Sequence, residues 1–287
     1  MVSQEDRTGV MKKRKIIDNI MYGIMAAAMT SVIAALLFVV LYIFRSQAGF
    51  LRWSFLTSVE TGILPMLVTT IYVVLVSIAV ALPVGIASAI FLNEYSGDSG
   101  LIRTLRLAIE TLAGIPSIIY GLFGLLVFCR FCGFGQSIVA GALTLSIMIL
   151  PVIIRTTEES LKAIPVTFRE GSLALGATKI QTITHVVLPA ALPGIVTSVI
   201  LAIGRVVGES APVLLTVGIS KKLPGGIFES GRTLTIHLYY LTNEAVRPED
   251  FSIAFATASV LVILVVGINT VAKVIASRFR RNLGEIQ

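Results

Sequence analysis

An arginine and a glutamate interrupt an apolar, membrane-length stretch over residues 189–217. Arg205 and Glu209 are four residues apart, so on a helix they would share one face and could form an ion pair. A helix that starts at Pro189 rises about 24 Å before it reaches Arg205, which places this arginine in the middle to outer part of a bilayer. A charge at that depth costs about 2.5–3.5 kcal/mol on insertion scales. We therefore expect Arg205 to face a cavity or a partner.

Two interpretations of this pair follow. In the first, Arg205 and Glu209 neutralise each other and fix helix packing. In the second, the planar donors of Arg205 bind a tetrahedral oxyanion in transit, and Glu209 holds the arginine between binding events or moderates its affinity. Gly208 and Pro212 beside the pair would allow bending. We take the second interpretation as the working hypothesis.

The whole chain has the composition of a membrane protein. Hydrophobic residues make up 55%, charged residues 14%, and the mean hydropathy is +0.92. A soluble domain is nearer a quarter charged. The net charge of +7 comes from basic residues at the ends of apolar runs, which is typical of topology signals and not of nucleic-acid binding. The sequence therefore predicts an all-α integral membrane protein.

Six membrane-spanning helices are expected. They cover about residues 21–44, 67–92, 107–128, 137–154, 189–217 and 252–275. We expect residues 1–20 to form an N-terminal tail and 277–287 a C-terminal tail. Residues 60–276 would form the transmembrane domain, including a polar loop over 155–188.

An even number of spans puts both termini on one side of the membrane. That side carries fifteen of the 23 lysines and arginines, the opposite side carries seven, and Arg205 lies within a span. Because basic residues concentrate in cytoplasmic segments, both tails and the 155–188 loop are predicted to be cytoplasmic.

The 155–188 loop should contain two short helices. Thr167 and Glu170 have the spacing of a capping box for the first, and Gly176 is a natural left-handed stop. A second helix is expected over about 179–187. An exposed Leu173/Leu175 edge fits a groove on a soluble partner, or else the loop is an amphipathic connector at the membrane surface.

The spacing within this loop resembles the EAA loop of bacterial ABC importer permeases. The matching residues are Glu170, Gly171, Ser172, Gly176, Val186, Leu188 and Pro189. Gly171 and Ser172 replace two alanines of the pattern, and Val186 replaces isoleucine. In that family the loop forms a coupling helix that docks on the ATP-hydrolysing subunit. The resemblance thus implies that Glu170, Gly171, Ser172 and Gly176 lie at this contact.

Three further stretches resemble the phosphate importer permeases of this family. They are ALPVGIASAIFLNEY (81–95), AGIPSIIYGLFG (113–124) and GRVVGESAPVLLT (204–216). The resemblance implies the MetI-like permease fold in a bacterial inner membrane. It also implies a heterodimer with a second, homologous permease, two copies of an ATPase that uses ATP and Mg²⁺, and an external phosphate-binding protein. The arginine and glutamate that match Arg205 and Glu209 are considered important for uptake in that family.

The AGIPSIIYGLFG stretch predicts a bent, closely packed helix, because it combines Pro116 with Gly114, Gly121 and Gly124. Gly114, Pro116 and Ser117 would either line the pathway or serve packing alone.

The sequence lacks the motifs of ATP-binding sites, metal sites and hydrolase active sites. The chain has no G-x-x-x-x-G-K-[ST], H-E-x-x-H or G-x-S-x-G motif, so we expect no ATP site, bound metal, cofactor or enzyme activity. Cys129 and Cys132 form a single C-x-x-C, a weak signal for a metal or redox site. Glu110 is expected to reach the membrane interface, and His185 and His237 to lie on polar surface.

Three alternatives remain open. A single arginine does not distinguish one oxyanion from another, so the cargo could be sulfate, molybdate or a phosphonate. A secondary transporter could use Glu209 as a proton site. A membrane scaffold could report external phosphate to a signalling system, with or without transport.

Overall fold

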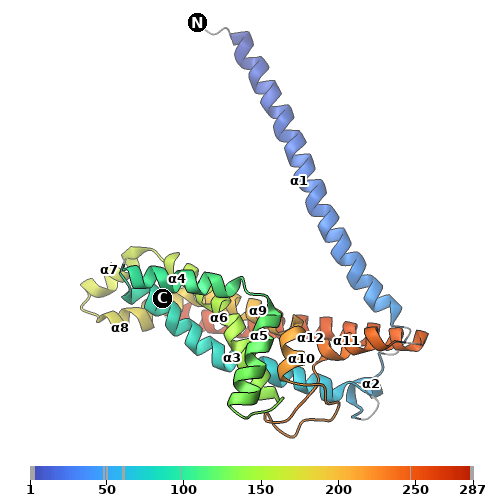
Figure 1. The fold of residues 1–287 in the computed structure, drawn as a ribbon. Helices are drawn as coiled ribbons and strands as arrows, with labels where there is room; N and C mark the ends of the chain where they lie inside the picture. The colour runs from blue at the N-terminus through green and yellow to red at the C-terminus, as the bar shows by residue number, and fades with distance from the viewer. Residues whose placement is uncertain are drawn as a thin grey trace.

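The computed structural model describes residues 4–47, 49, 51–59, 62–97, 99–245 and 247–284, and these contain helices and loops but no strand. Five of the helical segments are long and apolar enough to cross a membrane: Ile17–Ser46, Leu64–Tyr95, Ile138–Lys162, Lys179–Gly208 and Glu249–Ile275. A sharply bent pair of shorter helices makes up to six. The all-α, membrane-spanning class predicted from hydropathy is therefore confirmed (Figure 1).

The bent pair occupies the region where the third span was predicted. It consists of α4 (Gly100–Ala113) followed by α5 (Ser117–Gly124) and the π-helical η2 (Leu125–Phe131), and the two parts meet at 99°. Gly114 ends α4, and Pro116 (φ −57°, ψ 138°) precedes α5. A proline disfavours helix in the residue before it, so Ile115 cannot continue α4 into α5. The predicted bend is present, but α4 does not continue the direction of α5 as a single span over 107–128 would.

The core lies where α3 (Leu64–Ile90), α6 (Ile138–Lys162) and α9 (Leu188–Gly208) pack together. On α6, Leu145, Ile149 and Ile153 are fully buried. Small polar residues tie α3 to α6, since the Ser77 hydroxyl donates to the Ala142 carbonyl at 3.2 Å and the Ser146 hydroxyl donates to the Ser77 carbonyl at 3.1 Å. Helix α6 is thus the central element against which the others are placed.

Three glycines allow close approach around α6. A Cβ at Gly124 of α5 would lie 2.0 Å from the Thr144 hydroxyl, and one at Gly141 would lie 2.1 Å from a methyl of Val217. A Cβ at Gly121 would lie 2.8 Å from the Cα of Pro212, on α10 (Ala211–Thr216). Because no side chain fits at these positions, α5, α6 and α10 form one tightly packed unit.

The predicted fifth span over 189–217 is broken. Helix α9 ends at Gly208, Glu209 is extended (φ −77°, ψ 134°), and α10 begins at Ala211. Apolar residues flank the break on both sides, so hydropathy averaged over a membrane-length window merges α9 and α10 into one span.

The two ends of the elongated body carry different short helices (Figure 1). One end holds α7 (Val166–Ala174) and α8 (Lys179–Thr182), and the other holds α2 (Trp53–Thr57) and α11 (Leu234–Glu244). Helix α11 lies within residues 218–250, between the fifth and sixth predicted spans, where the sequence predicted no helix. The final helix, α12 (Pro248–Gly284), packs on α9 and α11.

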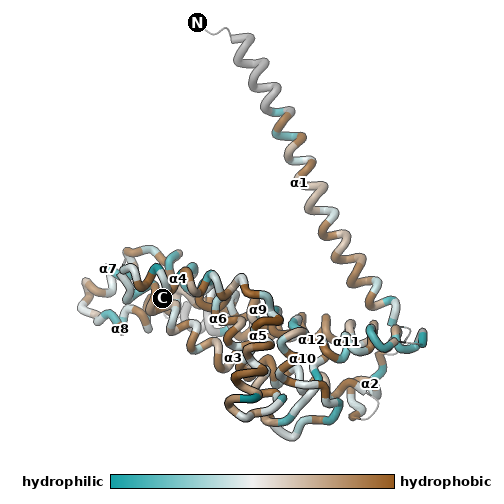
Figure 2. Tube along the Cα trace, in the orientation of Figure 1, coloured by the Kyte–Doolittle hydropathy of each residue, from teal (hydrophilic) through white to brown (hydrophobic). Residues whose placement is uncertain are grey.

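Helix α1 (Gln4–Ser46) diverges from the rest of the body (Figure 1). Its Ile17–Ser46 segment contains the predicted first span over 21–44 and is not buried by other parts of the chain. It is predominantly apolar along this length (Figure 2). Near its end, Tyr42 contacts Phe255 of α12 edge-on, with ring centroids 5.6 Å apart.

Candidate functional site

Arg205 and Glu209 lie at the break between α9 and α10. Arg205 is in the last turn of α9, and its Nε is 3.8 Å from the Glu209 carboxylate. The two residues do not share a continuous helix face as the sequence suggested, because the helix stops at Gly208 and Glu209 turns back to meet the arginine. Their side chains are 30% and 18% exposed, so the pair is accessible from one side.

The accessible side is the open face of α9. Gly204 and Gly208 are exposed, and a Cβ at either would meet nothing within 4 Å. On the inner side, Tyr120 of α5 is buried and near enough for the charge of Arg205 to act on its hydroxyl. That hydroxyl donates to the Leu112 carbonyl of α4 at 2.7 Å, which fixes the α4–α5 bend beside the arginine.

The guanidinium of Arg205 is held loosely. Its ion pair with Glu209 is long, and within the described ranges no hydrogen bond ties its terminal nitrogens to another group. A partly exposed arginine with free planar donors can take two oxygens of a tetrahedral anion.

The residues of the predicted pathway motif sit at the α4–α5 bend. Gly114 and Pro116 are exposed and Ser117 is half-buried. A Cβ at Gly114 would meet only the Thr111 carbonyl, at an ordinary 3.5 Å, so packing does not require glycine there. The structure connects this motif to Arg205 through Tyr120, one turn further along α5.

The second group of predicted site residues lies on α7 and in the turn after it. Gly176 has φ +86°, and it donates to the Leu173 carbonyl at 3.0 Å while Ala177 donates to that of Ser172 at 3.2 Å. This is the hydrogen-bond pattern of a Schellman C-cap, so the left-handed stop predicted at Gly176 is confirmed.

The capping box predicted at Thr167 and Glu170 is wrong. Helix α7 begins at Val166, directly after an extended Pro165 that makes no side-chain cap, so Thr167 is already inside the first turn. A capping box is instead present at the start of α8. There the Gln181 amide donates to the Thr178 hydroxyl at 3.3 Å, and the Thr178 amide donates to the Gln181 side chain at 2.8 Å.

The surface of α7 is available to a partner. Glu170 and Gly171 are exposed, as are Leu173 and Leu175. Ser172 is half-buried, and its hydroxyl is 2.9 Å from that of Thr182, which holds α7 against α8.

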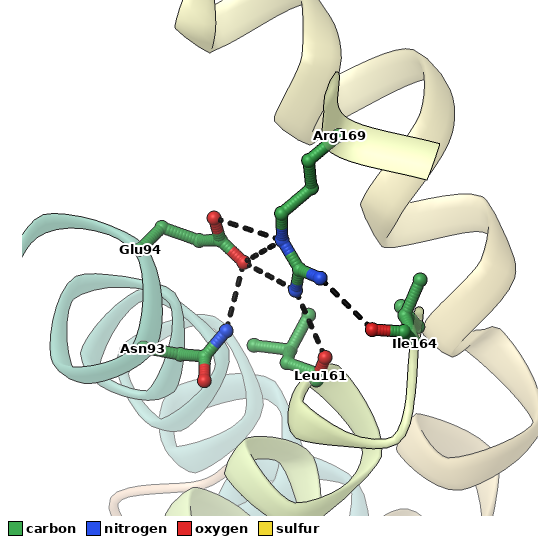
Figure 3. Close-up of polar contacts among 5 residues, drawn as sticks. All are labelled: Asn93, Glu94, Leu161, Ile164 and Arg169. Carbon is green, nitrogen blue, oxygen red and sulfur yellow. Dashed lines mark hydrogen bonds and ion pairs between the residues drawn. The ribbon is translucent and has the colours of Figure 1, made fainter. Parts of the chain in front are cut away.

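An ion pair that the sequence analysis missed ties α7 to the membrane helices (Figure 3). The Arg169 guanidinium donates to the Glu94 carboxylate at 2.8, 3.1 and 3.3 Å, and to the carbonyls of Leu161 and Ile164 at 2.9 and 3.0 Å. Asn93 donates to the same carboxylate at 2.8 Å. The side chains of Arg169 and Glu94 are only 19% and 8% exposed. From the sequence, Arg169 is counted only among the fifteen basic residues that mark the cytoplasmic side of the membrane. It is 75 residues from Glu94, so no local spacing could have linked the two.

Glu94 belongs to η1 (Phe91–Tyr95), the π-helical end of α3. Helix α8 also holds this element, because the Lys179 ammonium lies 4.6 Å from the centre of the Tyr95 ring. Both short helices of the predicted coupling loop are therefore attached to the same end of α3.

A polar cavity of about 240 Å³ lies nearby between α4 and α6. Glu110 lines it together with Arg106 and Glu158, which form an ion pair at 3.0 Å. Lys162 pairs with the same glutamate at 2.8 Å.

The histidine predictions had different outcomes. His185 is exposed, as expected, although it lies on the π-helical η3 (Ile183–Val187). His237 was expected on polar surface and is instead 8% exposed on α11. Burial, with the positive charges of Arg232 and Lys221, lowers the pKa of His237 to about 4.

Of the two cysteines, Cys129 is buried and Cys132 exposed, and both are free.

Residues 81–283 match the family of binding-protein-dependent transport system inner membrane components. The chain belongs to this family, whose members are permease subunits of ABC importers.

Two relatives support this assignment, one of them over nearly the full length. The chain is 32% identical to the probable ABC transporter permease protein YqgI of Bacillus subtilis, over 94% of this chain and 98% of the relative. It is 40% identical to the phosphate transport system permease protein PstA 1 of Mycobacterium tuberculosis H37Rv, over 72% of this chain and 68% of the relative.

Solved transporters share the fold. The inward-facing MetNI methionine ABC transporter matches with a TM-score of 0.59 and 25% identity, over 76% of this chain and 94% of that one. A bacterial alginate ABC transporter matches with a TM-score of 0.69 and 15% identity, over 93% and 97%. The MetI-like permease fold expected from the resemblance is therefore confirmed.

Proposed function

We propose that this chain forms one half of the translocation pathway of an ATP-driven importer of inorganic phosphate. The observation that carries the proposal is Arg205, partly exposed on the open face of α9 and held only by a 3.8 Å ion pair to Glu209. The 40% identity to a phosphate transport permease supports phosphate as the cargo.

The geometry of the pair favours weak, reversible binding. Arg205 lies in the last turn of α9, where the negative end of the helix dipole stabilises its charge, and Glu209 adds a second attraction. An arriving phosphate must compete with both. Its affinity is thereby lowered, as transport requires, because a tightly held anion would not be released.

We further propose that α7 is the coupling helix, with Glu170, Gly171, Ser172 and Gly176 at the contact with a partner ATPase. The exposed Leu173 and Leu175 would fill a groove on that subunit. Arg169 would transmit the motion of α7 to α3, because three of its five hydrogen bonds go to Glu94 at the end of α3.

The remaining partners follow from the family. They are a second homologous permease, a pair of ATPases that use ATP and Mg²⁺, and an external phosphate-binding protein. In the bacterial inner membrane, the α7–α8 end and both termini would face the cytoplasm, and the α2–α11 end would face outward. The charge distribution along the chain supports this orientation.

The test is uptake of labelled phosphate, with sulfate in parallel, into proteoliposomes that contain the complete importer. Arg205→Gln should lower phosphate uptake at least tenfold, the equivalent of about 1.4 kcal/mol, while ATP hydrolysis persists. Arg130→Gln is the matched control, because Arg130 is exposed on η2, and it should leave uptake unchanged. Unchanged uptake in Arg205→Gln would remove Arg205 from the pathway. Uptake of sulfate in place of phosphate would refute the cargo assignment.

A further inference from the structure

A second polar cavity, of about 160 Å³, lies at the α11 end of the body. Its polar lining residues are Lys221, Arg232, His237, Tyr240, Glu244 and Asp250. None of them was singled out as a site from the sequence, and the proposed transport mechanism does not use them.

Arg232 is only 8% exposed, and its orientation is fixed. Its Nε donates to the Ile219 carbonyl at 3.0 Å, and its guanidinium carbon lies 4.5 Å from the centre of the Tyr240 ring. These contacts leave the two terminal nitrogens without a hydrogen-bond acceptor among the residues that the structure describes. A buried guanidinium in this state presents a fork of donors suited to two oxygens of one anion.

His237 provides a second unsatisfied group in the same cavity. It is also 8% exposed, and its Nδ1 has no hydrogen-bond partner in the described part of the chain. The charges that act on its ring are those of Arg232 and Lys221, both positive. The ring is therefore neutral at pH 7, and its Nδ1 is enclosed, so the charges that attract an anion to the cavity are those of Arg232 and Lys221.

Two carboxylates limit the affinity of such a site. Glu244 is exposed and contributes a negative charge near Arg232. Asp250 is engaged elsewhere, since it accepts a hydrogen bond from the Arg247 amide at 2.9 Å. A small anion would thus be attracted by Arg232 and Lys221 and weakly repelled by Glu244 and by Asp250, whose hydrogen bond to the Arg247 amide leaves its charge in place.

We propose that this cavity is a second, low-affinity oxyanion site that takes inorganic phosphate through Arg232 and Lys221, next to the His237 ring. Helix α11 is joined to α9 beside the first site, because the Thr235 hydroxyl donates to the Val207 carbonyl at 2.7 Å, two residues from Arg205. The choice of phosphate rests on the proposed function. The cavity would hold the anion at the outward end before it reaches Arg205.

Histidine spectroscopy tests this directly on the untagged full chain in lipid nanodiscs. The chain has two histidines, so ¹³C-histidine labelling gives one signal from His237 and one from the exposed His185. At constant ionic strength, inorganic phosphate should shift the His237 signal in a saturable manner and leave the His185 signal in place. A His237 signal that neither phosphate nor sulfate moves would overturn the proposal.

Variants assign the effect to the cavity. Arg232→Gln should weaken phosphate binding at least about tenfold. Lys221→Gln should weaken it about fivefold, whereas Lys222→Gln, at an exposed lysine outside the cavity, should have no effect. Glu244→Gln should bind phosphate several-fold more tightly, a gain that misfolding cannot produce. Equal affinities in Glu244→Gln and the unmodified chain would count against the site.

Failure of this proposal can be told apart from failure of the proposed function. Arg205→Gln should abolish uptake but keep the His237 shift. A shift caused by sulfate and not by phosphate would keep the oxyanion site and refute the cargo.

Discussion

Replacing Glu94 with glutamine should loosen α7 without disturbing the membrane core. The carboxylate of Glu94 accepts three of the five hydrogen bonds made by the Arg169 guanidinium. Glu94→Gln removes the negative charge, while Arg169 keeps its bonds to the Leu161 and Ile164 carbonyls. The positive charge of Arg169 would then be largely buried without a carboxylate to neutralise it.

The magnitude follows from the burial of the pair. Removing one partner of a buried ion pair costs about 3–5 kcal/mol. Arg169 is 19% exposed, and glutamine still offers one oxygen, so we expect about 2 kcal/mol, or roughly thirtyfold in the equilibrium that releases α7.

Hydrogen exchange of the amides in α7, measured on the chain in nanodiscs, is the suitable assay, because it reports local opening. Exchange should accelerate by roughly thirtyfold in Glu94→Gln. A charge swap that combines Glu94→Arg with Arg169→Glu should not restore protection. A carboxylate at position 169 would face the Leu161 and Ile164 carbonyl oxygens and repel them.

Glu159→Gln is the matched control on α6. Glu159 pairs with Arg155 at 3.4 Å, but both side chains are about two-thirds exposed, so its loss should cost at most about 1 kcal/mol. Protection of α7 that is the same in Glu94→Gln and Glu159→Gln would refute the reasoning.

Four further substitutions test local features. Gly124→Ala places a Cβ against Thr144 and should cost about 1–3 kcal/mol, seen as a lower melting temperature that Thr144→Ala partly restores. Gly171→Ala meets open space and should raise the stability of α7 by about 0.5–1 kcal/mol, with ATPase copurification intact. Gly176→Ala must adopt a left-handed conformation and should lower the stability of α7 by about 1–2 kcal/mol. Hydrogen exchange of the α7 amides should slow in the first variant and accelerate in the second. Burial lowers the pKa of His237 from 6.5 to about 4 in the folded chain. Between these pH values the unfolded chain binds a proton at His237 and the folded chain does not, so the free energy of unfolding should fall as the pH drops from 6.5 to about 4. Thermal unfolding against pH should show a shallower slope for His237→Asn, and an unchanged slope would contradict the assignment.

Features that depend on residues close together in sequence could be predicted well. Hydropathy located the membrane helices because bilayer thickness sets their length. The stop at Gly176 could be predicted because only the backbone of that residue must turn left-handed. By contrast, both Thr167–Glu170 and Thr178–Gln181 match the capping-box pattern, and the position of Pro165 decides that only the second is used.

Features that depend on tertiary packing could not be predicted. The Arg169–Glu94 pair joins segments 75 residues apart, and only the folded arrangement of α3, α6 and α7 brings them together. The break after Gly208 lies inside a membrane-length stretch in which Gly208 and Pro212 suggested bending, but those residues did not fix where α9 ends. The burial of His237 follows from α11, a short helix inside a segment rich in turn-forming residues. The candidate site could therefore be assigned to Arg205 and Glu209 from sequence, but not the manner in which they meet.

The glycine contacts among α5, α6 and α10 restrict where this molecule can change shape. Gly121 lies against the backbone of Pro212, Gly124 against the Thr144 side chain and Gly141 against the Val217 side chain, so these helices cannot slide past one another without collision. They must move as one rigid body. A transition between outward and inward access therefore has to be taken up by rotation about the two interruptions at the edges of this block, the Gly114–Pro116 bend and the extended Glu209. Because Glu209 is itself one of those joints, any rotation there also changes the distance between its carboxylate and Arg205. If Arg205 binds the anion as proposed, its affinity and the direction of access would then depend on the same backbone angle.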